Sequence, residues 1–429
     1  MSAVVVFIIF AICLVIAIPI SISLGIVAVL PGAFDTSFTA SAGYVIRSMV
    51  GGIDSFPLLA VPMFVLAGIL MAHGKISEKL FDVFVYFLGN KRAGIPCAVI
   101  ITCLFYGAIS GSAPATVAAV GSMTIPLLIE LGYEKDFSTA IVAVAGGLGV
   151  IIPPSIPFIM YAMATGESVS DLFLAGIVPG MMISALLIFY AYYYCRRHGE
   201  DREKIQAKMD QLKEKGFFNI LKESIWALLS PVIVLGCIYT GVASPTEAAV
   251  ISVFYSLFVS LFIYKSIKVK QIWGIMVEAM KTYAPILFIL ATSTAFSRVL
   301  TLMQVPQDVS AWIMTHFSNE IVLLIVINVV LLIVGMVMDT TPAILILSPI
   351  LLPIVEHVGM NPIHFGVMMI VNLAVGFVTP PVGVNLFVAS SLTNVPMMQI
   401  AKKAMPMIGY FMLALLLIAF IPAISLCLL

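Results

Sequence analysis

Long apolar stretches, separated by short polar ones, follow each other from residue 3 to residue 429. A bilayer interior offers no water to backbone amides, so such stretches cross it only as helices or as closed barrels. None of them shows the alternation of a transmembrane strand. Hydrophobic residues make up 62% of the chain and charged residues 10%, which leaves too little charge for a water-facing surface. We predict an all-α polytopic membrane protein embedded in a lipid bilayer, which excludes soluble enzymes and nucleic-acid binders.

The distribution of lysine and arginine assigns the polar segments to the two sides of the membrane, because short basic loops stay in the cytoplasm. Four segments are basic: 73–93, 196–223, 265–281 and 394–404. Three segments contain neither residue: 165–171, 304–320 and 358–365. We place the first group inside and the second group outside.

This assignment predicts two re-entrant hairpins. Stretches 94–109 and 117–131 lie between two inner loops, and about 16 helical residues reach only about 24 Å, short of a core of about 30 Å. They therefore form a hairpin that enters from the inside and turns at 110–116. Residues 321–356 lie between two outer loops and form a second hairpin, which turns at 338–342. Five crossings separate the hairpins, so the two enter from opposite faces.

Glycines and prolines repeat along the chain at one offset, 227 residues (359 − 132 = 227). The matching pairs are Gly132/Gly359, Pro126/Pro353, Gly149/Gly376, Pro153/Pro380, Pro154/Pro381 and Pro179/Pro406. The hairpin prolines, Pro114 and Pro342, differ by 228, which a single-residue gap explains. Duplicated halves of opposite orientation are typical of secondary transporters. We predict two inverted repeats, each with a re-entrant helical hairpin and a broken helix.

The double prolines break the spans 137–164 and 366–393. Proline lacks an amide donor, so carbonyls of the preceding turn become free, and in lipid they must line a cavity or bind a cation. Hard oxygen ligands favour Na⁺ as the coupling ion over a soft metal, with H⁺ as an alternative and no other cofactor expected. The predicted sodium ligands are the tip and break residues Ser110, Gly111, Ser112, Gly149, Pro153, Gly335, Asp339, Thr340, Thr341, Gly376 and Thr379. For Asp339, helix capping is the alternative role.

Half-helix N-termini carry partial positive charge and suit a carboxylate. We therefore expect a small organic acid to bind between the two tips, near Ser155, Pro381 and Asn385. Arg298 lies deep in the stretch 283–303. Three roles are open to it: a contact with the substrate, an ion pair with an acid elsewhere, or an extension to the surface. Arg47 lies in an amphipathic stretch and has either a surface role or a contact with substrate or partner.

Four motifs give the chain a family resemblance: residues 54–59, 107–112, 147–155 and 376–386. They resemble the large membrane subunit of tripartite ATP-independent periplasmic (TRAP) transporters, with the sialic-acid type as the nearest likeness. The resemblance implies an elevator-type, sodium-driven importer of small organic anions in the bacterial inner membrane. It also implies two partners, a small four-helix membrane subunit, expected here as a separate chain, and a soluble periplasmic substrate-binding protein.

Several points stay open at the level of sequence. Residues 3–30 form one tilted helix or two helices broken at Pro19. A stand-alone carrier without binding protein is the alternative to the tripartite system, and an intramembrane aspartyl protease using Asp54 and Asp339 is a remote one, because no GxGD motif accompanies them. The predicted units are a scaffold helix and arm (1–56), a connector (57–93), transport elements of repeat 1 (94–195), a cytoplasmic linker (196–224), scaffold helices of repeat 2 (225–282), a connector (283–320) and transport elements of repeat 2 (321–429).

Overall fold

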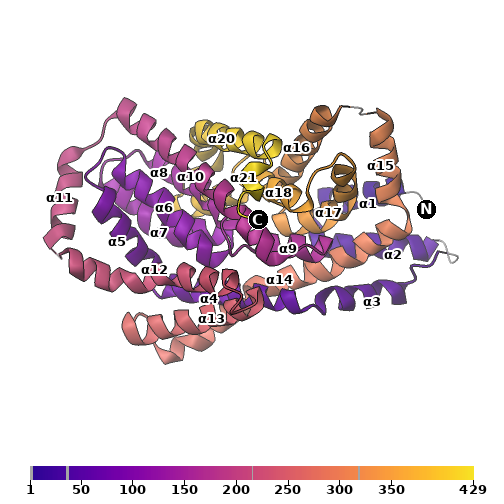
Figure 1. Cartoon of the computed structure of the whole chain (residues 1–429), viewed down its shortest axis with the longest axis horizontal. Coiled ribbons are helices and arrows are strands. Elements are labelled where there is room, and N and C mark those ends of the chain that lie inside the picture. Colours follow the sequence, from indigo (N-terminus) through magenta and orange to yellow (C-terminus); the bar gives the residue numbers. More distant parts are fainter. Residues whose placement is uncertain (1–2, 35–37, 215, 317–318) are drawn as a thin grey trace.

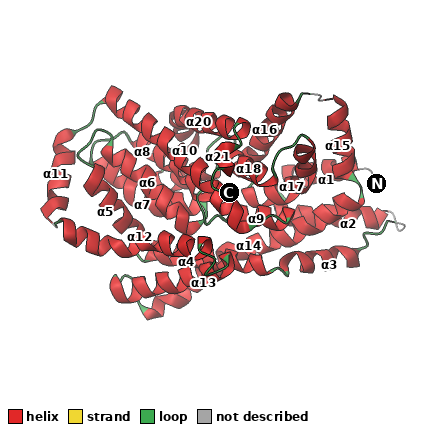
Figure 2. Cartoon of the chain, viewed as in Figure 1, coloured by secondary structure: helices red, strands yellow, loops and turns green. Residues whose placement is uncertain are grey.

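The computed structural model describes residues 3–34, 38–214, 216–316 and 319–429. Figure 2 shows these residues as helices joined by loops, and no strand occurs in the described ranges. Nine of the described helices are long and apolar enough to cross a membrane. The prediction of an all-helical polytopic chain is therefore confirmed.

The described residues up to 214 form eleven α-helices and two 3₁₀ turns. These are α1 (Ala3–Val15), α2 (Ile20–Phe34), α3 (Ala42–Ile53), η1 (Phe56–Leu59), α4 (Ala60–His73), α5 (Ile76–Leu88), α6 (Gly94–Ser110), α7 (Ala113–Glu130), α8 (Lys135–Ala145), η2 (Gly146–Val150), α9 (Ile156–Thr165), α10 (Val169–His198) and α11 (Arg202–Glu214). The N-terminal stretch is thus two helices with the break just before Pro19, as expected where proline cannot continue the hydrogen-bond ladder.

The described residues from 216 onward form ten α-helices and one π turn. These are α12 (Phe217–Tyr239), α13 (Pro245–Phe258), η3 (Val259–Ile263), α14 (Val269–Leu302), α15 (Val305–His316), α16 (Glu320–Val337), α17 (Thr340–His357), α18 (Pro362–Gly376), α19 (Val384–Thr393), α20 (Met397–Phe420) and α21 (Ala423–Leu426). Both helix interruptions predicted at the double prolines are present, between α8 and α9 and between α18 and α19.

Several segments expected to be loops are largely helical. Residues 73–93 contain α5, which buries Ile76 and Leu80 on its inner face. Residues 265–281 mostly belong to α14, which runs on through the predicted span without a break. Amphipathic segments at a membrane surface satisfy their backbone groups by forming helices, and a count of basic residues does not reveal this. In the basic linker, Lys215 lies outside the described residues.

The helices form a long body with different elements along its two edges (Figure 1). Helices α3, α12, α13 and α14 follow one long edge, and α10, α16 and α20 follow the other. The hairpin helices α6 and α7, with α8, α9 and α18, lie between them and share one large buried core. The N-terminal helices pack on α14 through a separate cluster, in which Phe7 and Phe10 contact Phe296.

Candidate functional site

The tip of the first hairpin packs against the interruption between α8 and α9. The carbonyl of Gly111 accepts a hydrogen bond from the amide of Ile156 at 3.3 Å. Gly111 has a φ of +61°, and a Cβ there would lie 2.9 Å from the carbonyl oxygen of Pro154. Only glycine meets both demands at low cost. The predicted turn and the predicted break therefore form one unit.

Hydroxyl groups cross-link the inside of this first tip. Ser110 Oγ and Thr116 Oγ1 are 3.0 Å apart. Both hydroxyls lie within hydrogen-bond distance of the carbonyl oxygen of Ser112, and Thr116 Oγ1 donates to it at 2.8 Å. Beyond the break, Ser155 caps α9 and donates to the carbonyl of Val150 at 2.5 Å. Ser155 is fully buried, so in this conformation its hydroxyl serves the backbone of the break and faces no cavity.

The second hairpin packs against the second interruption in the same manner. The amide of Val382 donates to the carbonyl of Met336 at 3.2 Å. A Cβ at Gly376 would lie 2.6 Å from the Cα of Gly335, and a Cβ at Gly107 in the first hairpin would lie 2.7 Å from the Cα of Gly149. These close approaches keep the repeat offset, because 335 − 107 = 228 and 376 − 149 = 227. Each tip therefore touches its own break at equivalent glycines.

The polar residues of the second tip serve the start of α17. Asp339 is its N-cap, and Asp339 Oδ1 accepts a hydrogen bond from the amide of Thr340 at 2.7 Å. Thr340 and Thr341 are buried. Thr379, within the facing break, donates its hydroxyl to the carbonyl of Val375 at 2.7 Å. The capping role of Asp339 is thus observed, and sodium coordination by this tip stays a prediction.

The two hairpin–break units interlock. Asn385 at the start of α19 is fully buried, and its side-chain amide donates to the carbonyl of Ala143 in α8 at 3.0 Å. The hydroxyl of Tyr161 in α9 donates to the carbonyl of Pro362 at 2.7 Å. Asn385 Oδ1 is buried and has no hydrogen-bond partner among the described residues. Asn385 therefore joins the two hairpin–break units, and its side-chain oxygen remains a buried acceptor that no described residue satisfies.

A cavity of about 500 Å³ lies between α3, α9, α14 and α17 and contains Arg298. Its wall includes Glu167, in the segment without basic residues that we placed outside. Within the described part of the chain the guanidinium of Arg298 has no hydrogen bond or ion pair. Arg47, in contrast, donates from Nε to the carbonyl of Gly43 in its own helix at 3.2 Å and does not line this cavity. Of the two arginines, Arg298 is therefore the one that lines a cavity and has no partner among the described residues.

A second cavity, of about 530 Å³, lies between α4, α14 and the first hairpin. Ser110 and Ser112 line this cavity at the hairpin tip. His73 and Glu278 line it at the basic segments 73–93 and 265–281, which we placed inside. Helix α14 therefore borders one cavity toward each side of the membrane. Neither cavity is lined by Ser155, Pro381 or Asn385, so the structure does not gather all predicted substrate residues in one place.

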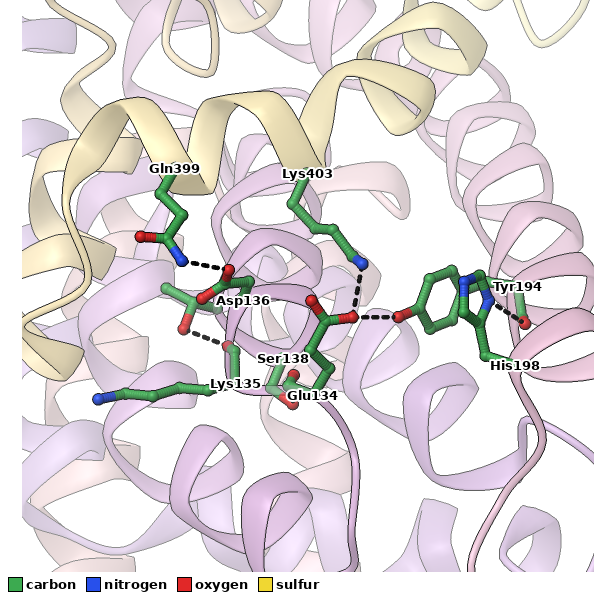
Figure 3. Close-up of polar contacts among 9 residues, drawn as sticks. Glu134, Lys135, Asp136, Ser138, Tyr194, His198, Gln399 and Lys403 are labelled. Atoms are coloured by element: carbon green, nitrogen blue, oxygen red, sulfur yellow. Dashed lines mark hydrogen bonds and ion pairs between the residues drawn. The ribbon is translucent and has the colours of Figure 1, made fainter.

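A polar cluster, absent from the sequence predictions, joins α20 to the start of α8 and to α10 (Figure 3). Lys403 of α20 contacts Glu134, which precedes α8, at 2.5 Å, and Tyr194 of α10 donates to the same carboxylate at 2.8 Å. Next to them Gln399 donates to Asp136 at 2.6 Å. The hydrogen bond from Lys403, together with that from Tyr194, lowers the pKa of Glu134 although partial burial opposes this.

Comparison with known proteins leads to the family that the four sequence motifs resemble. Residues 7–424 match the family described as the tripartite ATP-independent periplasmic transporter, DctM component. The isethionate TRAP transporter permease protein DctMQ of Oleidesulfovibrio alaskensis is 42% identical over 415 residues, which cover 97% of this chain and 64% of that protein. The C4-dicarboxylate TRAP transporter large permease protein DctM of Pseudomonas aeruginosa is 39% identical over 375 residues, 87% of this chain and 86% of the relative.

Among solved structures, the YdaH transporter of Alcanivorax borkumensis has a similar fold, with a TM-score of 0.64 over 93% of this chain and 96% of that one, at 13% identity. The helical fold, the two hairpin–break units and the two cavities define an integral membrane transport protein. The chain belongs to the DctM family, the large permease of TRAP transporters, and thus to the bacterial inner membrane. The resemblance seen in the four sequence motifs is confirmed.

Proposed function

We propose that the chain is the transport subunit of a sodium-coupled importer of a small organic anion. The observation that carries this proposal is the pair of cavities on either side of one interface, between α14 with its neighbours and the interlocked hairpin–break units. Volumes of about 500 and 530 Å³ lie within the range of small-molecule sites. Each cavity meets a hairpin element on one wall and α14 on the other, as alternating access to a moving site requires.

The charge in the outward cavity favours an anion. Arg298 has five N–H donors in a planar fork that matches a carboxylate or a sulfonate. The relatives named above are an isethionate and a C4-dicarboxylate permease, and both of those compounds are small anions of this kind. We assign Arg298 the first contact with the incoming anion. A C4-dicarboxylate or a sulfonate is the substrate class that these observations favour, and sialic acid stays a narrower prediction.

Sodium is assigned to the junctions between tips and breaks. Pro153 has no amide to donate to the carbonyl of Gly149. Pro380 has none for Gly376, whose carbonyl instead accepts a hydrogen bond from the amide of Thr379 at 3.1 Å. Each of these glycines lies against a hairpin whose tip carries hydroxyl groups. Carbonyl and hydroxyl oxygens gathered at the C-terminal end of a half-helix suit a hard monovalent cation. The arrangement supports one sodium site in each repeat.

The interlocking of the two units supports an elevator movement. Asn385 and Tyr161 bind backbone carbonyls of the opposite unit, so the tips and breaks of both repeats are connected and move together. Helix α14 borders both cavities and is the surface past which the joined units slide. In this arrangement the two repeats have inverted orientation, and a small four-helix membrane subunit and a periplasmic binding protein complete the system.

Reconstitution tests this function. The chain is purified with its small membrane subunit, incorporated into vesicles and supplied with the binding protein and labelled succinate, isethionate or sialic acid. We expect uptake that requires both an inward sodium gradient and the binding protein. Uptake without the binding protein would favour the stand-alone carrier. Uptake driven equally well by a proton gradient without sodium would contradict sodium coupling.

A further inference from the structure

The 530 Å³ cavity at the first hairpin tip, which we call the inner cavity, adjoins a further cavity at one pair of side chains. A third cavity, of about 410 Å³, is lined by His73, Lys270 and Glu278. His73 and Glu278 also line the 530 Å³ cavity at the first hairpin tip. We call the third cavity the vestibule. The two residues thus form a wall that the vestibule and the inner cavity share.

The shared wall is a hydrogen-bonded contact between two helices. His73 Nε2, on the last residue of α4, lies 3.0 Å from Glu278 Oε2 in α14. The side chains are 48% and 55% exposed, so both can move without leaving a buried charge unpaired. His73 and Lys270 belong to the two basic segments 73–93 and 265–281. The positive-inside rule therefore puts the vestibule on the cytoplasmic side.

The charges around the vestibule match the release of an anion. A carboxylate at the mouth of a narrow cavity repels a departing anion, and the hydrogen bond to the imidazole of His73 holds this carboxylate in place. The vestibule lining carries three ionisable groups, His73, Lys270 and Glu278. Lys270 lies on the cytoplasmic side of the pair, because it lines the vestibule and not the inner cavity. A passing anion therefore meets the Glu278 carboxylate first and the attracting charge of Lys270 after it.

We propose that the imported anion leaves for the cytoplasm past the His73–Glu278 pair, with Glu278 as the barrier and Lys270 as the attracting charge. The proposal rests on the proposed function for the nature of the cargo. The field along the route is a property of the side chains alone and can be measured without any cargo. Failure of the proposed function would appear as a lack of uptake, whereas failure of this proposal would appear as a field that the charged side chains do not change.

The test uses charged thiol reagents as probes of the route. Ser112 lines the inner cavity at the hairpin tip, so a thiol in a Ser112→Cys variant is labelled only by reagents that reach the tip. The complete transporter in inverted membrane vesicles is exposed, on its cytoplasmic face, to an anionic and to a cationic methanethiosulfonate of similar size. Peptide-resolved mass spectrometry gives the labelling rate at position 112 for each reagent. The ratio of the anionic to the cationic rate is the readout.

Each charge on the route has a predicted effect on that ratio. A unit charge about 10 Å from a passing ion in water changes its local concentration by about two-fold, so removing one charge changes the ratio about four-fold. We expect Glu278→Gln to raise the ratio by about that factor. Lys270→Gln and His73→Gln lower it, the latter because Glu278 loses its partner.

A matched control separates local from general effects. Glu78 pairs with Lys75 at 3.9 Å in the neighbouring helix and lines neither cavity. Glu78→Gln should leave the ratio unchanged. An equal ratio for Glu278→Gln and Glu78→Gln would overturn the proposal, and so would an unlabelled Ser112→Cys variant in this assay. The exposed Lys270→Gln variant tests the same field if Glu278→Gln does not fold.

Discussion

The close approach of Gly149 to the first hairpin allows one substitution to be assessed in detail. A Cβ added at Gly149 would lie 2.4 Å from Thr116 Oγ1 and 2.7 Å from the carbonyl oxygen of Ser112. The hydroxyl can rotate, but the carbonyl belongs to the backbone of the tip. Gly149→Ala therefore forces the tip away from the break by a substantial fraction of an ångström.

The cost follows from two opposing terms. Because the clash involves a backbone carbonyl, the cost of overpacking lies in the upper part of its usual range, about 2–3 kcal/mol, while alanine in place of glycine gains about 1 kcal/mol in a helical conformation. The net change is a destabilisation of about 1–2 kcal/mol. For a chain of this size about 2 °C of melting temperature corresponds to 1 kcal/mol. We expect the purified protein in detergent, followed by tryptophan fluorescence, to melt about 2–4 °C lower.

The same variant also tests the sodium assignment. The wild-type protein should melt at a higher temperature in NaCl than in choline chloride, because a bound ion stabilises the folded state. Gly149→Ala should lose much of that difference. Gly409→Ala is the matched control, since a Cβ there meets nothing within 4 Å. The packing argument is refuted if both variants melt at the same temperature, and a full sodium response in Gly149→Ala contradicts the first sodium site.

Two further predictions concern charged residues. Arg298→Gln should raise the KM for uptake at least about ten-fold, as expected for a lost charge-assisted contact, whereas Arg47→Gln should change it little; equal effects in uptake assays would argue against the anion contact. Because the pKa of Glu134 is lowered by Lys403, the stabilisation is present above the ordinary carboxyl pKa and is lost as the pH falls through the lowered one. Lys403→Gln should flatten this acid-side fall of the melting temperature, and Lys402→Gln should not; a similar fall in both variants would rule out the Glu134 contact.

The turns and breaks of this protein could be predicted from glycine and proline alone. Gly111 adopts a positive φ against the break, and Pro153 and Pro380 stand where the helices stop. These residues limit the backbone locally, so their effect is visible in one sequence. The hairpins and interrupted helices therefore appear where the pattern placed them.

The contacts between distant segments could not be predicted in this way. Asn385 was expected near substrate, yet its amide binds Ala143, 242 positions away. Glu134 meets Lys403 across 269 positions. Nothing in a single sequence links such residues, because each has a local surrounding typical of many polar residues. The segments 73–93 and 265–281 were misjudged for another reason, since basic residues indicate a side of the membrane and say nothing about helix content.

The bond from Asn385 to Ala143 also orders the events of synthesis. The ribosome completes α8 about 240 residues before it reaches α19, and a bacterial ribosome adds about 5–20 residues each second. For at least about ten seconds the first hairpin and its broken partner remain in the membrane without the segment that closes them. During that interval the insertion machinery or surrounding lipid must shelter the exposed carbonyls, so a stop codon before residue 385 leaves an unfinished product for the quality-control proteases to remove.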